Sequence, residues 1–143
     1  MSMPAPTPAS PLTPGAYLKA RRCAAGLSIA DVVSHFLTAP RWGEQERTAW
    51  IKLIEAGVQP VSAFTLDALD QIFEFDRDVL AELDAIRLGA LAVEDAPAIC
   101  RSCACTEFDP CWTAPHNEPC AWAEPDLCTA CHHPAPAAIG AAA

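Results

Sequence analysis

The feature that most constrains this chain is a cysteine-rich stretch near its C-terminal end. Seven of the eight cysteines lie in one window, which reads CRSCACTEFDPCWTAPHNEPCAWAEPDLCTAC. A C-x2-C pair opens this window at Cys100 and Cys103, and a second pair closes it at Cys128 and Cys131. Because each pair places two sulfurs on one tight turn, the two pairs together can supply the four thiolates of a closed structural zinc site.

The window shows no convincing apolar repeat, so it cannot bury enough apolar surface to fold alone. A structural zinc ion contributes on the order of 10 kcal/mol to folding, which supplies the missing stability. No signal peptide is recognisable in residues 1–15, so we expect a soluble protein in the reducing cytoplasm, where disulfides are rare. An iron–sulfur cluster, which also needs four thiolates, is the less favoured alternative, followed by disulfides or free thiols.

The number of metal ions is left open by the residues between the two pairs. Three further cysteines lie there: Cys105, Cys111 and Cys120. His116 lies among them and is either their fourth ligand or an exposed loop residue. His132 and His133 directly follow the last cysteine and compete for the same role. Alternatively, two zinc ions that share one bridging thiolate would use seven cysteines and no histidine, so the sequence predicts one or two ions.

The order of these elements resembles that of small cysteine-rich modules appended to phage and prophage proteins. The elements are C-x2-C-x-C at the front, C-x-W at Cys120 and Trp122, and EPDLCxxC over residues 124–131. The resemblance implies a metal-binding module and no particular activity.

Upstream of the window, apolar residues recur at helical spacing in five short segments joined by brief turns, which predicts a compact all-α domain. The first helix begins at Pro14 or Gly15 and is ended by Gly26. The other helices are expected from Ser28, with Asp31 completing a capping box, from about 44 to 56, from Ser62 or Thr65, and from near Asp76 to Gly89. Cys23 stands apart from the other cysteines, and we expect it to be a small buried apolar residue.

These patterns divide the chain into five parts. We expect a disordered proline-rich lead (1–14), a helical domain (15–89), an acidic connector (90–98), a cysteine-rich zinc module (99–133) and a disordered low-complexity tail (134–143).

The helical domain resembles the helix-turn-helix domain of Cro/C1-type phage repressors over residues 15–83. YLKARRCAAGLSIADVV (17–33) looks like the first two helices of that family, and IEAGVQPVSAFTLDAL (54–69) looks like the end of the recognition helix, the turn and the fourth helix. The resemblance implies binding of double-stranded DNA through the third helix.

Two departures from the family pattern weigh against base reading. About eight inserted residues, around 38–45, separate the second and third helices, and two of the groove-facing positions are Ala49 and Trp50. The candidate DNA contacts are Arg41, Arg47, Thr48 and Lys52, whose basic members are alternatively an ordinary solvated face. Trp50 either packs in the core or is an exposed anchor for a protein partner.

The charge distribution leaves little surface for nucleic acid. The net charge is −9, and the segment 15–55 is the only one with a net positive charge, from six basic and four acidic side chains. No phosphate loop, nucleophile elbow or H-x-E zinc motif is present, so we expect no enzyme. The first hypothesis is therefore a phage-type DNA-binding regulator, in which the third helix or the basic end of the first helix meets DNA and the zinc module adds a second contact or a dimerisation surface. The second is a protein-interaction adaptor anchored by Trp50, Trp112 and Trp122. Neither hypothesis involves a membrane.

Overall fold

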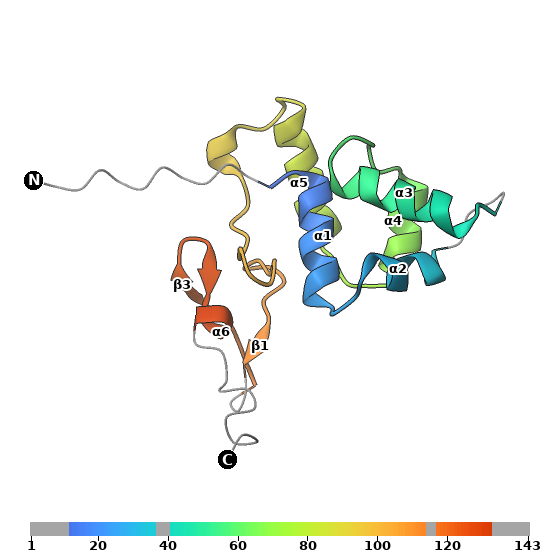
Figure 1. Cartoon of the computed structure of the whole chain (residues 1–143). Helices are drawn as coiled ribbons and strands as arrows, with labels where there is room; N and C mark the ends of the chain where they lie inside the picture. Colours follow the sequence, from blue (N-terminus) through green and yellow to red (C-terminus); the bar gives the residue numbers. More distant parts are fainter. Residues whose placement is uncertain (1–11, 37–40, 114–116, 133–143) are drawn as a thin grey trace, which may run out of the picture.

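The computed structural model describes residues 12–36, 41–113 and 117–132, and it shows five helices followed by a small irregular cysteine-rich module (Figure 1). The predicted fold class is confirmed at this level. The expected disordered lead, apart from residues 12–14, and the expected disordered tail lie outside the described residues. His116, His133 and the first part of the expected insertion lie outside them as well.

The five helices begin and end close to the predicted positions. They are α1 (Pro14–Ala24), α2 (Ile29–His35), α3 (Glu44–Glu55), α4 (Ala63–Asp70) and α5 (Arg77–Arg87). The side chains of Thr13, Ser28, Ser62 and Asp76 cap α1, α2, α4 and α5 by accepting backbone N–H groups, as N-terminal residues of these types do. The predicted capping box of Ser28 and Asp31 is present, so local sequence signals set these helix starts.

The helical domain is built around α1, which packs against both α3 and α5, while α2 packs against α3. The buried core draws on all five helices and on one residue of the cysteine-rich module. Its members are Tyr17, Leu18, Val32, Val33, Phe36, Ile51, Ile54, Leu69, Phe73, Phe75, Val79, Leu80, Leu83 and Ala104. Because Ala104 belongs to this cluster and Ile99 packs against it, the module is docked on the helical domain.

A close contact joins α1 to the C-terminal end of α3. A Cβ atom added to Gly15 would lie 2.0 Å from the carbonyl oxygen of Ile54, so the two backbones meet at a distance that only glycine allows. About two turns further along α1, the buried guanidinium of Arg22 donates two hydrogen bonds, of 2.8 and 2.9 Å, to the carboxylate of Glu55. Arg22 also donates to the carbonyl oxygen of Leu27, which fixes the turn into α2.

The expectation that Cys23 is buried is wrong, because its side chain is exposed. The buried side of α1 is set by Gly15, Leu18 and Arg22, which face α3 or the core, and Cys23 in the last turn lies outside that side. Spacing alone did not identify which of the small residues in this helix would turn inward.

The module is made of short elements that follow the 3₁₀ turn η1 (Val93–Asp95). Strand β1 (Trp112–Thr113) pairs with β2 (Glu118–Pro119), β3 (Trp122–Glu124) pairs with β4 (Leu127–Cys128), and both pairs are antiparallel. The last described element is the four-residue helix α6 (Thr129–His132). Among the described helices, none is both long and apolar enough to cross a membrane.

Replacing Gly15 with alanine is expected to lower the free energy of unfolding by about 3 kcal/mol, because the added methyl group would force the backbones of α1 and α3 apart. Urea denaturation followed by far-ultraviolet circular dichroism measures this change. The matched control is Gly43→Ser at the N-cap of α3, where the φ of −66° is ordinary and an added Cβ atom meets nothing within 4 Å. This control should be neutral or slightly stabilising. Equal loss in both variants would contradict the close contact.

Candidate metal centre

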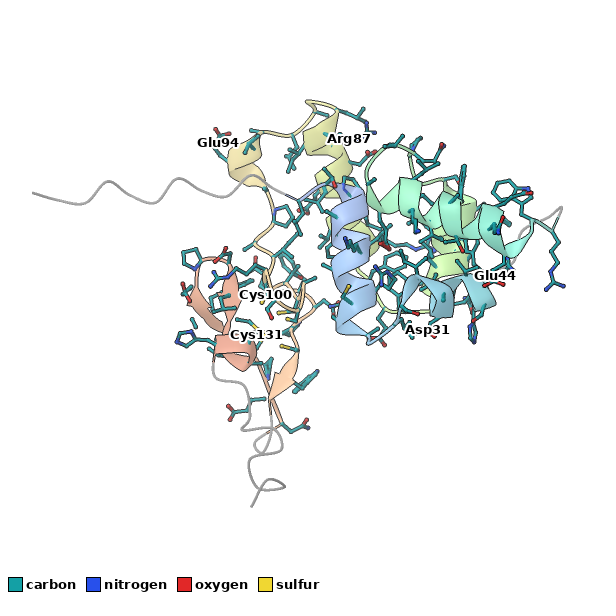
Figure 2. All side chains as sticks on the ribbon, in the orientation of Figure 1. Asp31, Glu44, Arg87, Glu94, Cys100 and Cys131 are labelled. Carbon is teal, nitrogen blue, oxygen red and sulfur yellow. The ribbon has the colours of Figure 1, made fainter. Side chains whose placement is uncertain are left out.

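The four cysteines of the two C-x2-C pairs come together in space as their spacing predicts. The Sγ atoms of Cys100, Cys103, Cys128 and Cys131 all lie within 4.8 Å of one another, which makes a tetrad that can hold a metal ion. The first pair lies on the turn that opens the module, whereas Cys128 ends β4 and Cys131 lies on α6. Figure 2 shows the labelled side chains of Cys100 and Cys131 near one another within the module. We call this set the outer tetrad.

Backbone hydrogen bonds shape the first turn of the outer tetrad. The amide of Ala104 donates to the carbonyl oxygen of Cys100, and the amide of Cys100 donates to that of Cys105, each at 2.9 Å. The sulfur of Cys100 accepts the amides of Ser102 and Cys128, at 3.4 and 3.5 Å. These N–H groups point at a sulfur and favour its thiolate form, which is the form that binds metal.

Ala104 is held in a left-handed conformation within this turn, with a φ of +64°. Such a conformation costs a residue with a Cβ atom about 1 kcal/mol or more. The cost is offset here because Ala104 is only 1% exposed and packs into the helical core. The turn that presents the first cysteine pair is therefore also the point where the module docks on the helices.

A second tetrad lies beside the first and shares two of its members. It consists of Cys103, Cys105, Cys111 and Cys128, whose sulfurs also lie within 4.8 Å of one another, and we call it the inner tetrad. The sulfur of Cys105 lies 4.0 Å from that of Cys111 and 3.7 Å from that of Cys120. All seven cysteines predicted as ligands therefore belong to one sulfur cluster.

This sulfur cluster takes the place of an apolar core within the module. The buried residues of the module's own cluster are Cys100, Cys105, Leu127 and Cys128. Apart from the remaining cysteines, the only other apolar residues packed against it in the described part of the chain are Trp122 and Ala130. The module thus has little apolar surface to bury, as the sequence indicated, and its order depends on what joins the sulfurs.

The pKa values of these thiols differ because burial and N–H or S–H donors act in opposite directions. Burial, reinforced by neighbouring thiols, raises the pKa values of Cys105 and Cys111. Burial also raises the pKa of Cys103 to about 12. For Cys128 the same burial is outweighed by the amide of Cys131 and the thiols around it, which lower its pKa to about 6. So many sulfurs cannot all become thiolates together without a cation among them.

The histidines contribute no ligand that the structure describes. Neither tetrad contains a histidine within the ranges 12–36, 41–113 and 117–132. His132 is exposed on α6, and its Nδ1 lies 3.6 Å from a carboxylate oxygen of Glu124. It therefore faces an acidic side chain of β3, while His116 and His133 are among the undescribed residues.

The residues predicted to contact DNA are not all on the surface. Arg47 is buried, and its Nη1 donates to the carbonyl oxygens of Val33 and Phe36 at the end of α2, so the expectation of a solvated side chain is wrong. The last carbonyl groups of a helix have no partner within the helix, and Arg47 is buried because it donates hydrogen bonds to those that end α2. Arg41 and Lys52 are exposed, as expected.

Two further residues of α3 are placed by packing. Thr48 is half-buried and donates its hydroxyl to the carbonyl oxygen of Glu44. Trp50 packs against the core and lies edge-on to Trp42, with ring centroids 5.4 Å apart. Of its two interpretations, the structure supports that of a core residue.

A shallow groove on α3 includes a polar residue that sequence reasoning missed. It is lined by Glu44, Gln45, Thr48, Ala49 and Lys52. The signal for Gln45 was present, because positions 45, 48, 49 and 52 share one face of a helix. The sequence analysis placed Gln45 in the inserted stretch 38–45, whereas the structure places it in the first turn of α3.

Comparisons with protein-family models, with curated proteins and with solved structures find no match to this chain. The structure by itself therefore establishes a five-helix domain followed by a cysteine cluster that can hold metal.

Removing metal with a chelator under reducing conditions is expected to abolish the order of residues 99–132 and to leave α1 to α5 folded. The reason is that the module packs around sulfur, whereas the helices have their own apolar core. Amide ¹H–¹⁵N spectra with and without chelator report on both parts at once, and adding zinc back should restore the lost signals. A module that stays ordered without metal and without disulfides would contradict this expectation.

Proposed function

We propose that the protein is a small DNA-binding transcriptional regulator of phage or prophage type, with a divergent Cro/C1-like helix-turn-helix domain and a zinc-stabilised module. The observation that carries the proposal is the outward face of α3. There Gln45, Thr48 and Lys52 line an open groove, and Arg41 lies exposed just before the helix. Amide and hydroxyl groups can bond base edges, and Lys and Arg can contact phosphates.

The longer connection between α2 and α3 does not separate the two helices, which supports this proposal. Arg47 reaches from α3 to the last carbonyl groups of α2, so it clamps the pair together across the inserted residues. Arg22 and Glu55 then fasten α3 to α1. Arg47 thus positions α3, and in this proposal the exposed residues of the groove contact the DNA.

Zinc is the metal that best fits the cysteine cluster. Closed sites of four thiolates are typical of structural zinc, and an iron–sulfur cluster is the alternative with the same ligands. Because both tetrads consist of thiols alone, each can be closed without leaving a position open for water, so we assign the metal a structural role. Elemental analysis of the purified protein distinguishes zinc from iron.

A second candidate function, a protein-interaction adaptor, is favoured because most of the basic side chains already have partners within the chain. Six of the nine Lys and Arg residues are engaged with acidic groups or backbone carbonyls of the same chain: Arg21, Arg22, Arg47, Arg77, Arg87 and Arg101. Since DNA affinity depends on cations that reach phosphates, few remain for that purpose. An adaptor would instead use its acidic surface and the exposed Trp112 on a protein partner.

Replacing Lys52 with alanine is expected to weaken DNA binding several-fold and to reduce the slope of log affinity against log salt by about 0.9, the share of one phosphate contact. Fluorescence anisotropy with duplex DNA at several salt concentrations measures both quantities. The matched control is Arg87→Ala, which removes the same charge at the end of α5, far from the labelled Glu44 of α3 in Figure 2.

Gln45→Ala should reduce the preference for an operator sequence without changing the salt slope, because it removes a base contact and no charge. If the folded, metal-loaded protein does not bind DNA even at low salt, the regulator is excluded and the adaptor remains.

A further inference from the structure

The two tetrads cannot be filled independently, because they overlap. Cys103 and Cys128 belong to both, so the tetrads contain six different sulfurs, and Cys120 adds a seventh beside Cys105. Two tetrahedral ions need eight ligand positions in all. Within residues 12–36, 41–113 and 117–132 the cluster offers seven sulfurs and neither tetrad includes a histidine, so these ligands complete both ions only if at least one sulfur binds both of them.

The spacing of the sulfurs already matches that of metal-bound thiolates. A tetrahedral zinc ion with Zn–S bonds of about 2.3 Å separates its sulfurs by about 3.8 Å. The distance between Sγ atoms is 3.8 Å for Cys103 and Cys128, and 3.7 Å for Cys111 and Cys128. It is 4.0 Å for Cys105 and Cys111 and 3.7 Å for Cys105 and Cys120. These pairs are also too far apart for disulfide bonds, which need about 2 Å.

Cys128 is the sulfur that connects the two groups. Its sulfur lies 3.8 Å from that of Cys103, the other shared residue, and 3.7 Å from that of Cys111, which belongs to the inner tetrad alone, and both distances are tetrahedral spacings. It is 1% exposed and ends β4, which is paired with β3, so its position is fixed by the backbone. Its amide donates to the sulfur of Cys100, a ligand of the outer tetrad alone.

We propose that the module holds two zinc ions at once and that the sulfur of Cys128 bridges them. The outer ion is bound by the two C-x2-C pairs, and the inner ion by Cys105, Cys111 and Cys128 together with one more sulfur of the cluster. This inference rests on the proposal that the metal is zinc. It also implies that the module folds around a single two-metal core in which each ion depends on the shared ligand.

The test uses the full chain, loaded with zinc and kept reduced, and counts zinc ions per chain by native mass spectrometry and elemental analysis. The unaltered protein should carry two. Cys131→Ala removes a ligand of the outer ion alone and Cys111→Ala removes a ligand of the inner ion alone, so each should keep one zinc. Cys128→Ala should keep fewer than one, because it leaves both ions a ligand short. Retention of one full zinc by Cys128→Ala would overturn the bridge.

A measurement on the unaltered protein guards against a Cys128 variant that simply fails to fold. Loading with ¹¹³Cd should give two resonances split by ¹¹³Cd–¹¹³Cd coupling, since coupling passes through a shared sulfur. Two uncoupled resonances, or a single bound ion, would refute the bridge while leaving the zinc proposal intact. Absence of any bound zinc would refute both.

Discussion

The described part of the cysteine-rich module is organised around seven sulfurs that the fold brings to one place. The module has very few apolar side chains to bury, and its interior consists mainly of cysteines. Burial raises the pKa values of Cys103, Cys105 and Cys111, whereas N–H and S–H donors lower that of Cys128, so the thiols of the cluster differ in how readily they lose a proton. A divalent cation would favour the thiolate form of every ligand, and it would supply the cohesion that an apolar core supplies elsewhere in the chain.

The module and the helical domain are joined by contacts of different kinds. The methyl group of Ala104, carried on the turn between Cys103 and Cys105, is buried in the helical core. The guanidinium of Arg21 on α1 reaches the carboxylate of Asp109 at 3.4 Å and also donates to the carbonyl oxygen of Glu74. The cluster is therefore in physical contact with α1, the helix that also packs against α3.

Buried arginines give the helical domain its fixed geometry and reduce its capacity to bind nucleic acid. Arg22 is paired with the carboxylate of Glu55, and Arg47 donates to the carbonyl groups that end α2. Within the described residues the Nε of Arg47 is buried without a hydrogen-bond partner, so this arginine constrains the position of α3 but is weak evidence of added stability. Because these cations act inside the fold, the exposed Lys52 and Arg41 carry the proposed electrostatic contact with DNA.

The sequence by itself determined the features that depend on local chemistry. Capping residues such as Ser28 and Asp76 fixed where helices begin, helical spacing fixed their number, and the C-x2-C pairs identified the outer ligands, because each signal acts within a few residues of the chain. Only the tertiary structure decided which side chains turn inward. Arg47 was expected in solvent and is buried, and Cys23 was expected to be buried and is exposed. Spacing predicted that the two C-x2-C pairs meet, but only the fold decided that Cys103 and Cys128 are the sulfurs shared with the inner cysteines, because that depends on how the inner loop packs against both pairs.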